Sequence, residues 1–559
     1  MLSSNSLLSL DPDILLLIFE SAYAKGCLQP LSMTCRWIRQ LSLPVLFARI
    51  CLWPRALTPQ RFPLSTVRPY IRTLALINDR QPHLDLRRTY FCGALEVDAK
   101  HQFFLGALRE MTRLQTVVVD RDAVISSGLP FWVLDAIFST PQLRSVEIGS
   151  SMCLSVREDL STPQHVRLTG PVPPLVSFRR ALPSYKMYSR EPAEVALLYD
   201  LFKQLHATLQ VAEMPSETAP LRAFRKNDWP HLRELVLRGG PRRPSRVFMI
   251  ENLMQMPNLR ILKLELAQHC GAGPQPICPP GWAGGCPWPN LEVLTVASAH
   301  PDDELFAHLP GGLQELTIRC YPRHFALDAP KTQEAAIAEH QRWDSYLLTS
   351  HELLRIFRRC GTLVCLRHLD IEFATSSEDT ALLSRIAAAF PSVRFFQFLR
   401  YCKGSKHIAA PWAALGDALS PMTNLRLLRV HLDLNLAEND SAIATEAITS
   451  LWRPLSSSVR FVCQLVRWGW CIDWIPHRAI REPATGNIVG VEPLQDYESI
   501  DGYQPDAQLR RLFYFRQMHI LMELGMADAF GHELPLIHPA PHAVPPSRGL
   551  GWDAERDVV

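Results

Sequence analysis

The sequence predicts an α/β protein in which a small helical module precedes a long, irregular solenoid of strands backed by helices. Three observations predict this fold. Large apolar residues with helical spacing fill residues 10–47, a six-residue apolar pattern recurs ten times between residues 71 and 430, and helical patterns separate several of its copies. The chain is therefore expected to combine two parts with different tasks.

Composition supports a folded protein and excludes some partners. The 559 residues are 47% hydrophobic and 20% charged, which is typical of globular domains with a sizeable core. The formal net charge is only +3, so binding of nucleic acid through a basic field is not indicated. We expect two to four domains from a chain of this length.

The expected location is intracellular, either cytoplasmic or nuclear. The 14 cysteines are scattered, without the dense framework of a small secreted domain, which favours a reducing compartment. Asp11, Asp13 and Glu20 interrupt the apolar start of the chain, so no signal peptide is predicted. No run of eighteen apolar residues occurs, so no membrane span is predicted.

The first fifty residues have the pattern of three short helices. Asp11 or Asp13 can cap a helix whose first turn contains Pro12. One helical face then carries Ile14, Leu15, Ile18 and Phe19, and two further apolar groups follow, at Leu28, Leu31 and Met33 and at Trp37, Ile38, Leu41, Val45, Leu46 and Phe47. So small a domain cannot bury all of these side chains, and we expect some to form a partner-binding patch.

The segments Leu10–Phe19, Cys35–Trp37 and Leu43–Phe47 resemble an F-box, as found in many fungal F-box proteins. The match departs from the family pattern at Asp11, where a proline is usual, and at Asp13, where a glutamate is usual. The resemblance implies that the module binds a Skp-type adaptor of a cullin ubiquitin ligase. The residues implied in adaptor binding are Leu10, Pro12, Ile14, Leu15, Ile18, Phe19, Leu31, Cys35, Arg36 and Trp37. The alternative is an ordinary helical cap on the next domain.

The repeated pattern places apolar residues at the first, fourth and sixth positions of each copy. Its ten copies are Ile71-Leu74-Leu76, Leu114-Val117-Val119, Leu143-Val146-Ile148, Leu232-Leu235-Leu237, Leu259-Leu262-Leu264, Leu291-Leu294-Val296, Leu313-Leu316-Ile318, Leu366-Leu369-Ile371, Val393-Phe396-Phe398 and Leu425-Leu428-Val430. Helical patterns lie between them at Glu194–Leu209, Glu352–Arg359 and Thr380–Phe390.

This periodicity resembles leucine-rich repeats, in which each copy supplies one strand to the concave side of a solenoid. Copies start 27 residues apart at Leu232 and Leu259, and 22 apart at Leu291 and Leu313, as such repeats do. The ninth position, usually Asn or Cys, holds neither in any copy, so we expect irregular turns. The alternative is an unrelated α/β domain whose parallel strands share this spacing.

The pattern fades after residue 435. We expect a last strand or two within Arg453–Ile475, mostly loop over Pro476–Gln504 and an amphipathic helix over Ala507–Phe530 that either caps the solenoid or binds a partner. The predicted organisation is therefore an adaptor-binding module at 1–50, a solenoid at 65–435, an extension with a capping helix at 436–530 and a disordered Pro-rich tail at 531–559.

No catalytic, metal or cofactor site is predicted. The sequence contains no Gly-x-Ser-x-Gly elbow, His-Glu-x-x-His pair, phosphate loop or dinucleotide fingerprint. Cys270, Cys278 and Cys286 lack the pairwise spacing of zinc ligands and are interpreted as free cysteines. The acidic run that begins at Asp302 follows a proline and is interpreted as a helix start.

The resemblances imply a substrate receptor, not an enzyme. The module would bind the adaptor and cullin ligase, and the solenoid would bind an unknown protein target, with no nucleic acid or membrane partner. Candidate target contacts are the residues between the buried strand positions: Arg233, Glu234, Arg260, Lys263, Glu292, Thr295, Gln314, Glu315, Thr317, Arg367, His368 and Asp370. The main alternative is a leucine-rich-repeat scaffold outside any ligase, and a weaker one is an enzyme with an unrecognised site.

Overall fold

A computed structural model describes most of the chain. The described residues are 10–52, 57–77, 94–119, 131–149, 168, 170–180, 192–240, 247–269, 271–321, 343–344, 346–402, 412–432, 441–468 and 471–493.

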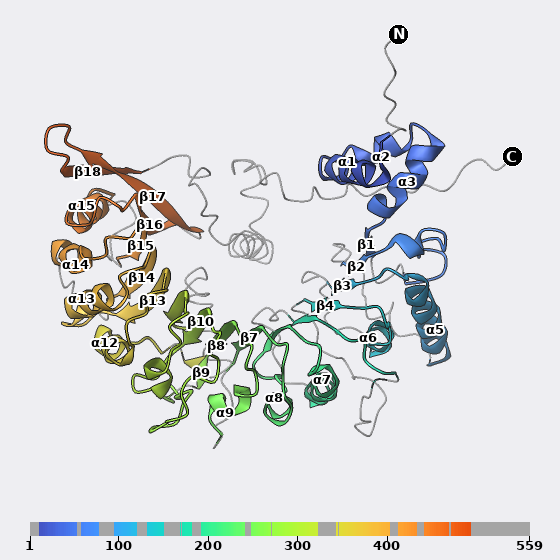
Figure 1. Ribbon diagram of the computed structural model, residues 1–559, viewed down its shortest axis with the longest axis horizontal. Coiled ribbons are helices and arrows are strands. Elements are labelled where there is room, and N and C mark those ends of the chain that lie inside the picture. Colours follow the sequence, from blue (N-terminus) through green and yellow to red (C-terminus); the bar gives the residue numbers. More distant parts are fainter. Residues whose placement is uncertain are drawn as a thin grey trace, which may run out of the picture.

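A curved sheet of 16 strands forms the inner side of a horseshoe, and helices line its outer side (Figure 1). The strands follow one another in chain order, parallel from β1 to β16, and β17 and β18 then join antiparallel. Their bounds are β1 Arg49–Leu52, β2 Thr73–Leu76, β3 Thr116–Val119, β4 Ser145–Ile148, β5 Ser177–Arg180, β6 Val211–Pro215, β7 Glu234–Gly239, β8 Ile261–Leu266, β10 Val293–Ala297, β11 Glu315–Arg319, β13 His368–Ala374, β14 Phe395–Tyr401, β15 Leu427–His431, β16 Phe461–Trp468, β17 Cys471–Arg481 and β18 Ile488–Pro493. A separate pair joins β9, Gln268–His269, to β12, Trp343–Asp344.

Helices alternate with the strands, as expected. Three of them, α1 Pro12–Ala24, α2 Leu28–Ser32 and α3 Arg36–Leu46, precede the sheet. The others on the outer side are η3 Arg68–Tyr70, α5 Ala94–Glu110, α6 Phe131–Phe138, α7 Pro192–Leu205, α8 Leu221–Lys226, α9 Met249–Leu253, η4 Glu304–Ala307, α12 Ser350–Arg359, α13 Asp379–Ala389, α14 Trp412–Leu419 and α15 Ser441–Trp452. The chain is thus a mixed α/β solenoid with helical backing.

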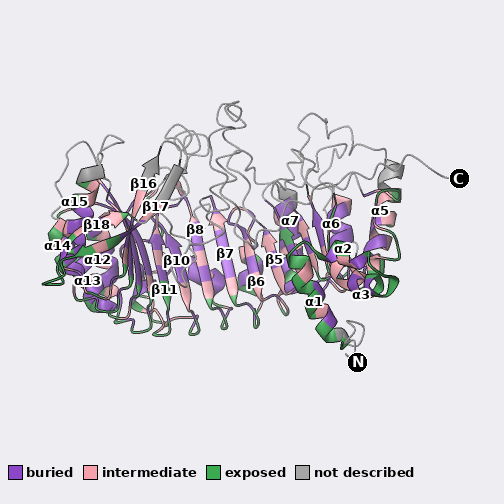
Figure 2. Cartoon of the chain, turned by 90° about the horizontal axis from the view of Figure 1, so that it is seen from above, coloured by how far each residue is buried: buried purple, intermediate pink, exposed green. Residues whose placement is uncertain are grey.

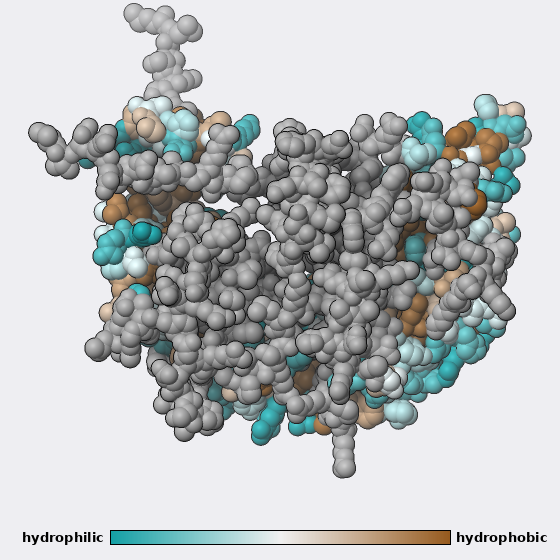
Figure 3. Space-filling model, turned by 180° about the vertical axis from the view of Figure 1, so that it is seen from behind, coloured by the Kyte–Doolittle hydropathy of each residue, from teal (hydrophilic) through white to brown (hydrophobic). Residues whose placement is uncertain are grey.

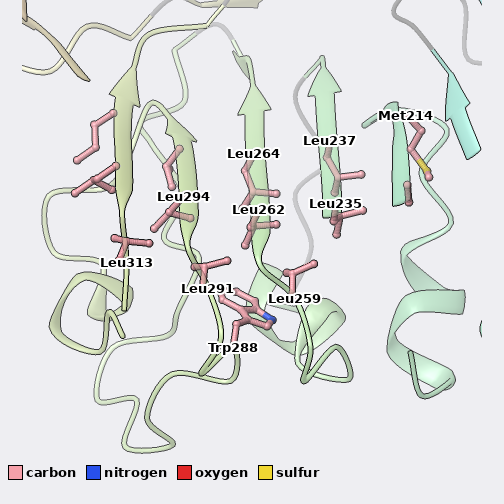
Figure 4. Close-up of a cluster of buried hydrophobic side chains, with 14 of the residues drawn as sticks. Met214, Leu235, Leu237, Leu259, Leu262, Leu264, Trp288, Leu291, Leu294 and Leu313 are labelled. Carbon is pink, nitrogen blue, oxygen red and sulfur yellow. The ribbon is translucent and has the colours of Figure 1, made fainter. Parts of the chain in front are cut away.

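The repeated apolar positions form the core. In all ten copies the first, fourth and sixth residues are at most 4% exposed, because strand residues two apart point to the same face. Leu235, Leu262 and Leu294 lie at equivalent positions on neighbouring strands (Figure 4). The strand register predicted from the sequence is confirmed.

Several strands escaped the pattern. In β5 the sixth position is Arg180, whose Nε lies 2.7 Å from Oε1 of Glu194 on α7, so a buried ion pair replaces an apolar side chain. In β6 the fourth position is the small residue Ala212, which is fully buried. A search for large apolar residues at these positions therefore does not find the repeats that contain β5 and β6.

The C-terminal part differs from the prediction. Where Pro476–Gln504 was expected to be mostly loop, β17 and β18 form a hairpin whose turn contains Gly486 at φ +71°. Glycine adopts this backbone angle without strain, so Gly486 is there because the tight turn of the hairpin requires it. The sheet runs from Arg49 to Pro493, beyond both limits of the predicted 65–435 solenoid. The predicted helix Ala507–Phe530 and the tail 531–559 lie outside the described residues.

Polar side chains just before several strands connect consecutive repeats. Each donates a hydrogen bond to a backbone carbonyl of the preceding repeat, as Asn258 does to Pro230 O at 2.7 Å and Asn424 to Pro391 O at 3.0 Å. Thr208 and Ser458 do the same to Leu175 and Leu425. These bonds satisfy carbonyls at the turns and keep consecutive repeats in register.

Within the described residues, no helix is both long enough and apolar enough to cross a membrane.

Candidate interaction surfaces

The N-terminal module is a three-helix unit with its own small core. The carboxylate of Asp11 caps α1 by accepting a hydrogen bond from the N–H of Asp13 at 2.8 Å, and the Sγ of Cys35 caps α3 by accepting one from Ile38. The core consists of Leu15, Phe19, Leu28 and Ile38, with Ala22, Leu31, Leu41, Val45 and Leu46 packed around it.

Many large apolar side chains of the same module are exposed. Met33 is 78% exposed, Leu17 66% and Ile14 48%, and Leu10, Ile18, Tyr23 and Trp37 are also exposed. Apolar surface is visible beside polar surface on this module, at the upper left of Figure 3. Because exposure of apolar side chains to water is unfavourable, so many exposed apolar side chains on so small a unit are typical of a binding surface.

The structure separates the predicted adaptor residues into two groups. Leu10, Ile14, Ile18, Cys35, Arg36 and Trp37 are exposed. Leu15 and Phe19 are 1% and 0% exposed, so they hold the module together and their predicted contact role is corrected. Leu31 is half-buried against the same core, and Pro12 begins α1.

Leu17, Tyr23 and Met33 join the exposed group although the sequence analysis did not select them. The helical spacing places Leu17 three residues from Ile14, which was the available signal.

The second surface is the concave side of the sheet. Residues between the buried positions form a row across the strands, one residue per strand in register. From β4 to β16 this row is Glu147, Arg179, Glu213, Val236, Lys263, Thr295, Thr317, Asp370, Gln397, Arg429 and Cys463. Most residues of this row are polar or charged, and both charge signs are present.

An ion-pair network covers the row from β5 to β8. Arg179 contacts Glu213 at 3.1 Å and Glu234 at 3.1 Å, and Arg238 contacts Glu213 at 3.3 Å and also Glu265. Burial disfavours the charged form of Arg238, but the neighbouring Glu265 and Glu213 carboxylates outweigh it and raise the pKa of Arg238. These contacts join the side chains of four neighbouring strands, β5 to β8.

A second polar group lies on β11, β13 and β14. Asp370 accepts hydrogen bonds from Arg319 and, at 3.3 Å, from Gln397. Glu372 accepts one at 2.9 Å from the N–H of Cys320. Asp370 and Glu372 are at most 2% exposed, so these carboxylates serve the fold.

The predicted target contacts therefore divide as well. Arg233, Arg260, Gln314, Glu315 and Arg367 are exposed, whereas Glu234, Lys263, Glu292, Thr317 and His368 are half-buried. Thr295 and Asp370 are 6% and 2% exposed, which corrects their predicted place on an accessible face. Asp370 is buried because it pairs with Arg319 of the neighbouring strand.

An apolar cluster lies among the C-terminal strands, and the sequence analysis did not predict it. Phe395, Leu427 and Cys463 form a buried cluster with Phe461 and Trp474 packed against it. The guanidinium of Arg429 lies 5.4 Å from the ring centre of Phe395 and 5.1 Å from that of Trp474. Cation–π contacts of this kind fix the arginine against the aromatic surface.

The described part of the cysteine loop and the acidic run are structural, and Cys270 lies outside the described residues. Asp303 caps η4, as predicted, and its carboxylate accepts hydrogen bonds from the N–H groups of Ile277 and Cys278. Burial raises the pKa of the Cys278 thiol, which keeps it protonated. Among the described residues, no three His, Cys, Asp or Glu side chains gather in a group that could hold a metal ion.

Comparison with known proteins does not place the chain in a family. No family model matches the chain, and no curated protein matches it. Matches are found to 28 chains of solved structures. One is the leucine-rich repeat-containing protein LegL7 from Legionella pneumophila, which is 11% identical over 75% of this chain and 91% of that chain, with a TM-score of 0.27. The leucine-rich-repeat-like character of this chain rests on its own strand register and buried positions.

Proposed function

We propose that this chain is the substrate-recognition subunit of a Skp–cullin–F-box ubiquitin ligase. In this proposal the N-terminal module binds a Skp-type adaptor, and the solenoid binds a protein target. The transfer chemistry belongs to other subunits. The broader part of the proposal, protein binding by a solenoid, is supported by the extended curved sheet, which presents one residue per strand along a continuous surface.

The observation that carries the adaptor half is the exposed apolar surface of the module. Leu17 and Met33 are more than half exposed although the module has its own core. An ordinary cap would turn such side chains toward the domain that it covers. Burying them against a partner would remove their apolar area from water, which favours association.

The test compares exposed apolar positions inside and outside the module. The full chain is titrated with a purified Skp-type adaptor by isothermal calorimetry. Leu17→Glu and Met33→Glu are expected to abolish binding, because each places a charge in an apolar interface. Val364→Glu is the matched control, since Val364 is 60% exposed but lies on the solenoid.

Circular dichroism of each variant checks the fold. Wild-type affinity in both module variants, or no heat of binding with the wild-type chain, would refute the adaptor role and leave the scaffold alternative. Equal loss in the Val364→Glu control would show that the apolar patch on the module is not the specific contact.

A further inference from the structure

A row of arginines follows the edge of the sheet where the parallel strands begin. The residue just before each strand donates its backbone N–H to the carbonyl of the equivalent residue one repeat earlier. Arg394 N bonds Arg367 O at 2.9 Å, Arg426 N bonds Arg394 O at 2.8 Å and Arg460 N bonds Arg426 O at 2.8 Å. These residues are therefore direct neighbours, one per strand, before β13, β14, β15 and β16. The strand spacing of about 4.8 Å separates their backbones.

These four side chains, which we call the arginine edge (Arg367, Arg394, Arg426 and Arg460), are exposed. Throughout the described chain, none of the four forms an ion pair or a side-chain hydrogen bond. Arginines elsewhere in the sheet differ, since Arg179, Arg238 and Arg319 each pair with a carboxylate on a neighbouring strand.

Like charges side by side on adjacent strands are unfavourable for the folded chain. Earlier along the same edge the arginines form a shorter run. Arg260 follows Arg233 directly, and the next edge residue is Glu292, whose Oε1 lies 3.4 Å from the Arg260 guanidinium. Gln314 then separates this pair from Arg367. Among the described strands, a run of four successive arginines thus occurs only before the last four parallel strands.

We infer that the arginine edge binds an acidic segment of a partner protein. Guanidinium groups form paired hydrogen bonds with carboxylates, and a row at strand spacing suits several Asp or Glu side chains in succession. The row is short and bounded. The exposed Glu315 lies beside its β13 end, next to His368 in the register, and Glu492 pairs with Arg478 on the hairpin beyond β16. The exposed Glu315 carboxylate at one end and the neutral Arg478–Glu492 pair at the other bound the row, which favours a short acidic segment over a long polyanion.

The turns of this edge are short and exposed, and they are visible as green tips along the lower margin of Figure 2. A partner could therefore reach the row without entering the concave side. The inference deepens the target-binding half of the proposed function and is independent of the adaptor-binding half.

The experiment uses the full chain and a fluorescein-labelled peptide of alternating glutamate and serine, long enough to span four strands. Binding is followed by fluorescence anisotropy at low and high salt. The triple variant Arg367→Gln, Arg394→Gln, Arg426→Gln is expected to weaken binding by about tenfold or more. Wild-type binding should weaken as salt rises, because exposed charges are screened.

The same edge offers a matched control. Arg72, Arg113 and Arg144 line a shallow pocket of about 560 Å³ before β2, β3 and β4, together with Thr112, Gln115 and Gln142. Replacing these three arginines by glutamine removes the same charge and should change the affinity by less than about twofold. A triple Arg→Lys variant of the arginine edge keeps the charge and should retain the salt-dependent part of binding.

Four outcomes would overturn the inference. They are equal losses in both glutamine variants, no loss in the arginine-edge variant, no binding of the peptide to the wild-type chain, and tighter binding of a single-stranded oligouridylate through the same arginines. Adaptor titration of each variant runs in parallel, so a failure here is distinguishable from a failure of the adaptor role.

Discussion

Arg400 on β14 forms an ion pair with Asp379, the first residue of α13, with Nε and Oδ2 2.8 Å apart. Both side chains are at most 10% exposed. The other oxygen of Asp379 accepts a hydrogen bond from the N–H of Ser376, and the Arg400 guanidinium lies 5.3 Å from the ring centre of Trp412 on α14. One buried pair thus joins a strand to two outer helices.

Removing one partner of this pair should be strongly destabilising. Asp379→Ala leaves the Arg400 guanidinium buried without its carboxylate, and we expect a loss of about 3–5 kcal/mol in the free energy of unfolding. Urea denaturation followed by circular dichroism measures it. The double variant Asp379→Leu, Arg400→Met should lose clearly less, because no charge remains buried. A double variant as unstable as Asp379→Ala would contradict this explanation.

The two classes of strand position should differ in cost. Leu262→Ala removes a fully buried side chain and should cost about 2–5 kcal/mol, whereas Lys263→Ala, at a half-buried position of the same strand, should cost less than about 1 kcal/mol. The Leu262 side chain is 0% exposed, whereas Lys263 is half-buried. Equal midpoints of denaturation for the two variants would rule out the register.

His477 should make the stability depend on pH. It is 5% exposed on β17, neither ring nitrogen has a hydrogen-bond partner in the described part of the chain, and burial lowers its pKa from 6.5 to about 4. Between these two values the unfolded chain binds more protons than the folded one. The stability contributed by neutral His477 is therefore present above about pH 6.5 and is lost as the pH falls toward 4.

The loss should approach about 3 kcal/mol, by the linkage between pKa shift and free energy. His477→Leu removes the titrating group and serves as the comparison. The difference in unfolding free energy between the two proteins is measured from pH 7 to pH 4 by urea denaturation. This difference separates the titration of His477 from that of the carboxyl groups, which both proteins share. A constant difference over this range would show that His477 is not the group responsible.

The sequence predicts most of the solenoid because burial and strand geometry impose the same spacing on every copy. Arg180 breaks that spacing in β5, and its partner Glu194 belongs to a helix that follows later in the chain. The pattern of neighbouring residues in the sequence does not predict an ion pair of this kind. The β17–β18 hairpin was hidden for another reason: its turn glycine, Gly486, and its neighbouring prolines have the composition of a loop.

The candidate surfaces were less predictable than the fold. A helical face identifies Leu15 and Leu17 equally as apolar, but only packing decides that Leu15 is 1% exposed and Leu17 66%. Asp370 occupies an intervening strand position, yet it is buried because Arg319, which is 51 residues earlier in the sequence, lies beside it. Its removal should therefore resemble that of Asp379 in cost, not that of Lys263.

The reversal of strand direction at β17 has a consequence for assembly. A parallel sheet that simply stopped would offer its last strand as a template on which another molecule could add. Here the final two strands run antiparallel, and α15 packs against β18. At the opposite end, β1 pairs only with β2 among the described strands and carries the exposed charge of Arg49. The edge strand β18 belongs to an antiparallel hairpin, whereas the edge strand β1 belongs to the parallel part of the sheet. Because the two edges differ in this way, addition of one molecule's β1 to another's β18 would not continue the parallel sheet, which opposes growth into open-ended fibres.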